Sequence, residues 1–425
     1  MSTNWKENGL EVSHFMGIKS ARLKLTRFNV LVGEQASGKS VLAKLCYFMT
    51  DAKEKIELGA IEGKTKREID KDLSKRFAQI FPPAAWGSGN FSIKYWDGGY
   101  RLNIERKKSS NSIKFVFEEN LSKFVASVRR RVNDLDVSSD QFGSRISSKW
   151  RKVEEYAASK RDACFGSDSA SNSVFIPAGR SYYSAMKEGV WEFIAKSITI
   201  DPIYTDFGTV YESTKSFFDR YGGVKKTGLQ EYTETFQDVI RGMPRRERGQ
   251  DYIDTLDGRR VPLQNASSGQ QEVYPLYATL RVVGFFSSLP TAVLVEEPEA
   301  HLYPASQAKI VWLLAYSLRY MPRGSSLIIT THSPYVLSTV NNLILAEQAL
   351  KSINSKKKIH ASAVARKFMR APLDSNSVSI FPIEGSRVSG FERDEFGLIS
   401  AKKIDQISSE IAEISNELLD FVYQQ

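Results

Sequence analysis

Hydrophobic and polar residues alternate with a period of two over residues 10–32, which predicts two strands with a break or bulge at Gly17. Three further short segments, 91–96, 100–106 and 113–117, carry the same strand signal. The turn Asp97-Gly98-Gly99 between the first two of them is typical of a β-hairpin. The N-terminal part of the chain is therefore expected to form an antiparallel piece of sheet.

Helical patterns occupy most of the segments between the predicted strands. They cover 51–85, 121–163 with an interruption near 137–143, 184–198, 203–242 with a break at Gly222-Gly223, 272–286 and 305–320. A last helix is predicted over 401–422, where apolar residues recur at spacings of three and four. The mixture of strand and helix signals predicts an α/β fold.

Continuous apolar runs mark a second group of strands. They lie at 173–177, 292–295 and 327–331, and each run leads into polar residues. Continuous apolar strands are typical of a parallel sheet buried on both faces, and the functional groups of such sheets lie at the carboxyl ends of the strands. We therefore expect a mixed central sheet with a site at that edge.

A glycine-bracketed loop follows the apolar segment 28–32. It fits the spacing G-x-x-x-x-G-K-S/T, and a helix-forming segment follows directly. Backbone amides in such a loop and the positive end of the helix favour a bound anion. Lys39 would reach the β- and γ-phosphates of a nucleoside triphosphate, and the Ser40 hydroxyl would ligate Mg²⁺. The predicted nucleotide-binding residues are Gly33, Glu34, Gln35, Ala36, Ser37, Gly38, Lys39, Ser40 and Val41.

Two carboxylates follow the apolar strand 292–295. Glu296 is placed to hold Mg²⁺, and Glu297 to polarise an attacking water. His332 follows the strand 327–331, where it would either donate to a γ-phosphate or cap the next helix. Pro298 after the acidic pair and the apolar strand before it argue against two unrelated surface glutamates.

The segment 266–271 places hydroxyls and a glycine directly before a predicted helix. Ser267, Ser268, Gly269 and Gln270 would form a second anion site at the helix N-terminus, or Ser267 would serve only as the helix cap. The residues alone leave both interpretations open.

Composition adds a basic bias and excludes some classes of protein. The formal net charge is +10, and the segment from Lys351 to Arg370 contains seven Lys or Arg and no Asp or Glu. Arg129-Arg130-Arg131 begins a second basic cluster. Both are compatible with a solvated surface, an acidic protein or nucleic acid.

The two cysteines and four histidines lack disulfide-framework or zinc spacing, and no apolar run is long enough for a membrane span. We therefore expect a cytoplasmic protein.

In this order, the four motifs resemble those of the ABC-type ATPases of the SMC, RecF and OLD type, including the AAA15- and AAA21-like ATPases. The resemblance implies a P-loop ATPase with a mixed central sheet, an antiparallel β subdomain and a short helical insertion. Gly33 to Ser40 become the Walker A loop, Glu296 and Glu297 the Walker B acids, Ser267 to Gln270 the signature segment, and His332 the switch histidine. In that family the signature of one subunit completes the ATP site of its twin.

The sequence departs from the family pattern in several places. Glu296 stands where Asp is usual, and Ser268 stands where a second glycine is common, so that Ser267 and Ser268 compete for the contacting role. The segment 175–180 is similar to the I-P-A-x-R element of OLD-like ATPases, which would bring Arg180 near the nucleotide. The implied domains are an ATPase lobe over 1–120, a helical insertion over 121–172, a second ATPase lobe over 173–350 and a basic linker with a helical region over 351–425.

The resemblance also narrows the function. The insertion is too short for the coiled coil of an SMC protein, and the segment after the ATPase core lacks the acidic cluster of a TOPRIM nuclease. The remaining resemblance is to stand-alone ATPase subunits of bacterial anti-phage systems such as PARIS (AriA) and Septu (PtuA).

Such a subunit is an ATP- and Mg²⁺-dependent sensor or scaffold. Its implied partners are a second copy of itself, a separate effector of the TOPRIM or HNH nuclease type and a phage-encoded trigger. The alternatives are a RecF-like repair factor, which would bind DNA through the basic residues, and a transporter cassette.

Overall fold

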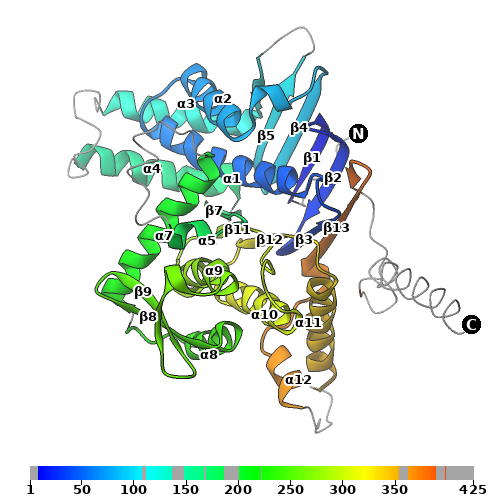
Figure 1. Ribbon diagram of the computed structural model, residues 1–425. Helices are drawn as coiled ribbons and strands as arrows, with labels where there is room; N and C mark the ends of the chain where they lie inside the picture. Colours follow the sequence, from blue (N-terminus) through cyan, green and yellow to red (C-terminus); the bar gives the residue numbers. More distant parts are fainter. Residues whose placement is uncertain are drawn as a thin grey trace, which may run out of the picture.

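The computed structural model describes residues 8–107, 112–135, 148–166, 169–185, 201–221, 223–353, 362–388 and 398. A single mixed sheet runs through the centre of the described part (Figure 1). Its strands, in spatial order, are β6 (Lys114–Phe117), β5 (Tyr100–Arg106), β4 (Phe91–Asp97), β1 (Asn8–Phe15), β2 (Ile18–Leu25), β14 (Arg387–Val388), β13 (Val378–Glu384), β3 (Phe28–Gly33), β12 (Ser326–Thr331), β11 (Thr291–Glu296) and β7 (Asn172–Ile176).

One half of this sheet is antiparallel. Strands β6, β5, β4, β1 and β2 pair in sequence-local hairpins, with β4 lying beside β1. The predicted strands at 91–96, 100–106 and 113–117 are confirmed. The prediction of two strands over 10–32 was wrong, because the chain forms three. The second break lies at Thr26 and Arg27, where the Asn29 side chain accepts a hydrogen bond from the Thr26 amide, and β3 then joins the sheet away from β2, beyond β14 and β13.

The other half is mainly parallel. Strand β3 lies between β12 and β13, and β11 lies between β12 and β7, all in parallel pairs. Every residue of β11 is buried, in agreement with the continuous apolar pattern. The predicted α/β fold with a mixed central sheet and an antiparallel part is therefore confirmed. Strand β13 comes from the segment predicted as basic linker and helical region, and it joins the centre of the sheet beside β3.

Helices lie on both faces of the central sheet (Figure 1). They are α1 (Lys39–Ile61), α2 (Lys66–Ile80), α3 (Glu119–Asp134), α4 (Ser148–Phe165), α5 (Ser181–Ala185), α7 (Pro202–Tyr221), α8 (Leu229–Ile240), α9 (Ser268–Phe285), α10 (Pro304–Tyr320), α11 (Pro334–Ile353) and α12 (Ala363–Phe368). Successive residues of a strand enter different cores. Leu294 packs with α1 to α4, whereas its neighbours Val293 and Val295 pack with α7 to α11. The sheet therefore separates two hydrophobic layers.

A small second sheet follows the segment predicted as helical over 203–242 with a break at Gly222-Gly223. Helix α7 ends at Tyr221, α8 ends at Ile240, and β8 (Gly242–Glu247) then pairs with β9 (Gln250–Thr255), which pairs with β10 (Arg260–Pro262). The helices predicted on either side of that break are confirmed, and α8 is shorter than predicted because Gly228 and Arg241, with φ of 79° and 49°, bound it in left-handed conformations. Most of the predicted helix 184–198, the interruption 137–143 and the helix 401–422 lie outside the described residues. Among the described helices, none is sufficiently long and apolar to span a bilayer.

Candidate functional site

The predicted phosphate-binding and acidic motifs meet at one edge of the parallel half. Val32 of β3 lies in register with Thr331 of β12, and Thr330 of β12 lies in register with Glu296 of β11. These residue pairs lie at the carboxyl ends of the three strands. The Walker A loop, the acidic pair and His332 are therefore neighbours, although they are far apart in the sequence.

The Walker A loop leaves room for an anion at the start of α1. Gly38 precedes the helix with φ of 104°, which favours glycine, and no side chain caps the first turn. A Cβ on Gly33 would lie 2.6 Å from the Ile383 carbonyl oxygen of β13. The loop thus folds tightly against β13 and presents uncapped helix amides. This donor set fits a polyphosphate.

Lys39 folds back over the loop that precedes it. Its Nζ donates to the carbonyl oxygens of Gly33 and Glu34 at 2.9 and 2.6 Å. It also lies 3.4 Å from His332 Nδ1. Burial lowers the pKa of Lys39, an effect opposed by the charges of Glu297 and Glu299. The ammonium is therefore held within the loop, with carboxylates close enough to favour its charged form.

His332 connects Lys39 with the second Walker B acid. Its Nε2 lies 3.2 Å from Glu297 Oε1, and an ammonium can only donate to Nδ1. The tautomer that satisfies both contacts carries its proton on Nε2 and donates it to Glu297. Between them, the two contacts join three segments of the chain in one continuous chain of polar groups.

The backbone around the acidic pair is strained. Glu297 has φ of 41°, a conformation that is unusual for a residue other than glycine, and its amide donates to the Thr330 carbonyl at 3.0 Å. Glu296 is buried, and its Oε2 accepts from the Ala178 amide at 3.4 Å. The two acids therefore have different settings, because Glu296 is enclosed whereas the Glu297 side chain is 41% exposed.

Glu299 belongs to the site but was missed in the sequence. Its Oε1 accepts from the Thr331 hydroxyl at 2.5 Å and from the His332 amide at 3.2 Å. Burial raises the pKa of Glu299, and Oε2 has no hydrogen-bond partner among the described residues. The side chain thus fixes the backbone that carries His332. A third acid in the run Glu296-Glu297-Pro298-Glu299 was the signal available in the sequence.

The signature segment caps α9. The Ser267 hydroxyl accepts from the Gln270 amide, and the Gln270 side chain accepts from the Ser267 amide, which forms a capping box. Ser268 is exposed at the first position of the helix. A Cβ on Gly269 would lie 2.8 Å from the His301 carbonyl, so that the segment packs directly on the loop that follows the Walker B acids.

Arg180 lies beside the same edge but is completely buried. Its guanidinium donates to the carbonyl oxygens of Pro177, Glu272, Glu296 and Glu297. These bonds attach Arg180 to the end of β11 and to α9. Contact between Arg180 and a nucleotide stays a prediction.

Ser40 and Glu296 are the predicted Mg²⁺ ligands. Ser40 is exposed in the first turn of α1, and Glu296 ends the strand that lies next but one to β3. No group of three or more His, Cys, Asp or Glu residues with metal-binding geometry occurs in the described part of the chain. A hydroxyl, one carboxylate and phosphate oxygens supply the hard oxygen ligands that Mg²⁺ prefers. The residues present thus fit a metal shared with a bound polyphosphate.

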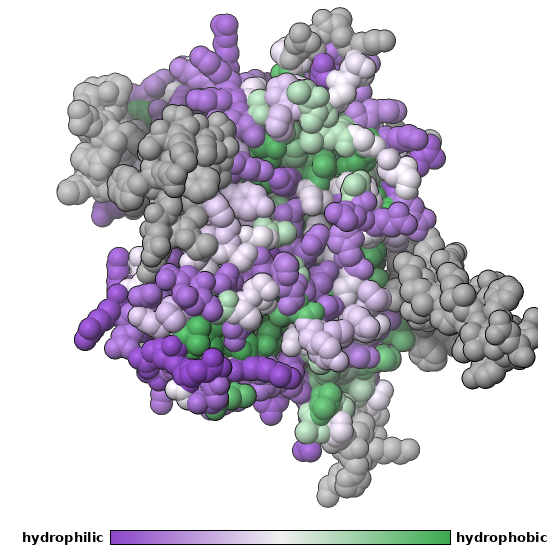
Figure 2. Space-filling model, viewed as in Figure 1, coloured by the Kyte–Doolittle hydropathy of each residue, from purple (hydrophilic) through white to green (hydrophobic). Residues whose placement is uncertain are grey.

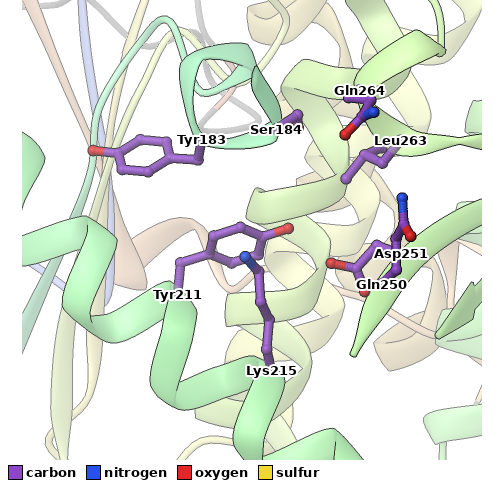
Figure 3. Close-up of a pocket in the computed structure, with 8 residues that line it drawn as sticks. All are labelled: Tyr183, Ser184, Tyr211, Lys215, Gln250, Asp251, Leu263 and Gln264. Atoms are coloured by element: carbon purple, nitrogen blue, oxygen red, sulfur yellow. The ribbon is translucent and has the colours of Figure 1, made fainter. Parts of the chain in front are cut away.

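A separate small cavity lies between α5, α7, β9 and the segment before the signature (Figure 3). Its volume is about 20 Å³, which holds a single water. The hydroxyls of Tyr211 and Ser184 are buried without a hydrogen-bond partner among the described residues. A water would satisfy them. The cavity is too small for a nucleotide.

Several of the basic residues form ion pairs where the structure describes them. Figure 2 shows a strongly hydrophilic band over β8 and β9. There Arg245 contacts Asp254 at 2.6 Å, and Arg246 contacts Asp219 at 2.7 Å. In the predicted basic tract, Lys351, Lys367 and Arg370 contact Glu347, Asp238 and Glu231. The run Lys356-Lys357-Lys358 lies outside the described residues.

A family model described as "AAA domain, putative AbiEii toxin, Type IV TA system" matches residues 196–338. The match covers less than half of the chain, and it includes the signature, the Walker B acids and His332. No curated protein matches the chain.

Several solved structures show a distant likeness. The SMC head domain from Thermotoga maritima is 12% identical with a TM-score of 0.36, over 78% of this chain and 91% of that chain. The Smc head with an extended coiled coil, bound to the C-terminal domain of ScpA from Pyrococcus furiosus, is 12% identical with a TM-score of 0.37, over 78% and 90%. The strand order, the four motifs and the family model support an ABC-like P-loop ATPase.

Proposed function

We propose that this protein hydrolyses ATP with Mg²⁺ at the edge formed by β3, β12 and β11. The observation that carries the proposal is the polar chain Lys39–His332–Glu297, with contacts of 3.4 and 3.2 Å. Three separate segments of the sequence thus bring an ammonium (Lys39), an imidazole (His332) and a carboxylate (Glu297) to one position. These are the groups that phosphoryl transfer to water requires.

Each residue has a distinct role in this proposal. Lys39 and the amides of the Walker A loop bind the β- and γ-phosphates. Ser40 and Glu296 hold Mg²⁺, which neutralises phosphate charge when bound. Glu297 accepts a proton from the attacking water, and His332 holds this carboxylate in place with the proton on its Nε2. Strain at Glu297 is consistent with a catalytic position.

The site is proposed to be shared between two copies of the chain. Ser267 is occupied as the cap of α9, whereas Ser268 is exposed at the helix start. We therefore assign the contact with the partner's ATP to Ser268 and to the helix amide of Gly269. Binding of ATP would then be coupled to dimerisation.

The cellular role proposed for this ATPase is that of a sensor or scaffold in a bacterial anti-phage complex, which holds a separate effector nuclease until a phage protein triggers release. Two lines support it: the resemblance to defence ATPases, and the family description, which names a putative toxin of a toxin–antitoxin system. Co-purification with the product of an adjacent nuclease gene would test the role. Recovery of the ATPase with duplex DNA at low salt, and without the nuclease, would instead support the repair-factor alternative.

Glu297→Gln tests the ATPase assignment. Removal of the general base should lower kcat by about 10²- to 10⁴-fold while ATP binding is retained. The variant should accumulate as an ATP-bound dimer in analytical ultracentrifugation. Glu154→Gln, at an exposed position of α4, is the matched control and should behave as wild type. Undiminished hydrolysis in Glu297→Gln would show that the catalytic base lies elsewhere.

A further inference from the structure

An ion pair with almost no solvent exposure lies between the Walker B acids and the signature helix. Arg180 is 0% exposed and Glu272 is 1% exposed. Arg180 Nε lies 3.4 Å from Glu272 Oε2. Isolated buried charges are costly, and a pair in this setting persists only where its hydrogen bonds are satisfied. The bonds of these two residues show what the pair holds together.

The guanidinium of Arg180 fixes the end of β11. Its Nη1 donates to the Glu296 carbonyl at 2.7 Å, and its Nη2 donates to the Glu297 carbonyl at 3.0 Å. The second bond stabilises the residue whose backbone is in the left-handed region. Displacement of the guanidinium would therefore move the proposed catalytic base without touching its side chain.

The same residue is joined to α9, whose N-terminus carries the signature. Arg180 Nε donates to the Glu272 carbonyl at 3.0 Å, and the Arg180 amide donates to Glu272 Oε2 at 2.9 Å. Glu272 Oε1 accepts from the Ser181 amide at 3.0 Å. Glu272 lies in the first turns of α9, close to the signature residues Ser268 and Gly269. Both carboxylate oxygens of Glu272 are thus used.

A guanidinium suits this place better than an ammonium does. Four of its N–H groups reach four different carbonyl oxygens, namely those of Pro177, Glu272, Glu296 and Glu297. The planar fork fixes these acceptors relative to one another, whereas the ammonium of a lysine would meet fewer of them and in no fixed arrangement. Arg180 therefore acts as a rigid joint between two elements.

We propose that Arg180 and Glu272 couple the two ATP sites of the dimer as positioning residues. This inference rests on the proposed shared site. Within one subunit, Arg180 contacts the Walker B acids that serve that subunit's own ATP and the helix whose signature serves the partner's ATP. A shift at one site is thereby transmitted to the other through a single buried side chain.

A mixed dimer separates coupling from local support. Two heterodimers are compared, and each contains one wild-type subunit. The other subunit carries Glu297→Gln alone or Glu297→Gln together with Arg180→Lys. A different affinity tag on each subunit allows the heterodimer to be isolated. The remaining active site uses the catalytic residues of the wild-type subunit and the signature of the altered one. We expect Arg180→Lys to lower its turnover by about fivefold or more, the usual lower range of coupling between sites. Arg180→Lys should also weaken the ATP-dependent dimer, so that the dimer dissociation constant measured by sedimentation is higher.

Several comparisons make the test decisive. Glu272→Gln should give the same defect from the other end of the pair, and it replaces Arg180→Lys if that variant does not fold. Arg246→Lys alters another well-paired arginine, bonded to Asp219 and Asp251, and should leave turnover unchanged. If adding Arg180→Lys leaves turnover and dimer affinity equal to those of the heterodimer with Glu297→Gln alone, the proposed coupling is wrong, but the shared site is not affected. Failure of Glu297→Gln to dimerise with ATP would overturn the shared site, and the coupling with it.

Discussion

The parallel and antiparallel halves of the central sheet both contain buried charged residues, but they use them differently. In the parallel half, Lys39, Glu296 and Glu299 gather where strands end and the chain turns. In the antiparallel half, Lys53 and Asp97 lie beneath the arm formed by α3 and α4. Helix α1 belongs to both regions, since Lys39 begins it and Lys53 lies in its middle.

The buried charges of the antiparallel half form a closed network. Lys53 donates to the hydroxyl of Ser169 and, at 2.7 Å, to the Ala170 carbonyl. Ser169 donates to Asp97 at 2.6 Å, and the Lys53 ammonium lies 4.9 Å from the centre of the Phe165 ring. These contacts attach α1 to the end of the arm and to the β4–β5 hairpin. Their partners are all supplied by the protein itself.

The charges of the parallel half are left partly open. Glu299 Oε2 has no hydrogen-bond partner among the described residues, and Glu297 is strained and half-exposed. Residues that break local rules of geometry or pairing concentrate where binding or catalysis uses them. An incomplete network thus marks the proposed site, whereas a complete network marks a structural joint.

His332→Ala should produce the largest effect among the changes that test this contrast. The substitution removes the donor between Lys39 and Glu297, and hydrolysis should fall by about 10²-fold, as expected for loss of one preorganised donor. Steady-state phosphate release measures the effect, and fluorescent-nucleotide binding should change much less. A His332 that only caps α11 would lower stability and leave kcat near that of wild type.

Much of the proposed site could be predicted because its motifs are local. The Walker A residues are consecutive, and the acidic pair directly follows a recognisable apolar strand. The period of two also located the strands of the β4–β5 hairpin. Local geometry and local sequence agree in these segments, so the pattern was sufficient.

The remaining features depend on contacts between distant segments. Strand β13 pairs with β3 across most of the chain length, and its sequence gave no expectation of a strand. In the sequence, Arg180 was predicted to lie near the nucleotide, and Glu272 was one residue of a predicted helix. Only the folded structure shows that they form a buried ion pair. Glu299 likewise gains its role through Thr331 and His332. No periodicity encodes such pairings.

Glu299 allows a finer test, because charge and acceptor can be removed separately. Glu299→Ala removes the acceptor for Thr331 and His332, and hydrolysis should fall by about 10-fold, as for other supporting partners of an active site. Glu299→Gln keeps an acceptor oxygen and should hydrolyse ATP at close to the wild-type rate. Equal defects in both variants would show that the charge, not the hydrogen bonds, is what matters.

The raised pKa of Glu299 also predicts a change in stability. Because the folded protein favours the protonated acid, the wild type loses stability as the pH rises from the ordinary glutamate value of 4.5 through the folded-state pKa. Glu299→Gln carries no such cost and should melt at a higher temperature than the wild type at neutral pH. The two melting temperatures should converge in acid.

Lys53→Met should have the smallest effect on hydrolysis, because its network is closed and lies away from the strand ends. Its effect should appear in the pH dependence of stability. Burial lowers the pKa of Lys53 from 10.5 to about 8. Between these values the unfolded chain holds one more proton than the folded protein, so the free energy of unfolding of the wild type rises with pH by about 3 kcal/mol relative to Lys53→Met.

Urea unfolding at pH 7, 9 and 10.5 measures the difference, and Lys160→Met, at an exposed position, should follow the wild type. Parallel curves for the wild type and Lys53→Met would show that Lys53 keeps its charge in the fold, and a loss of hydrolysis in Lys53→Met would show that the two halves of the sheet are not functionally separate.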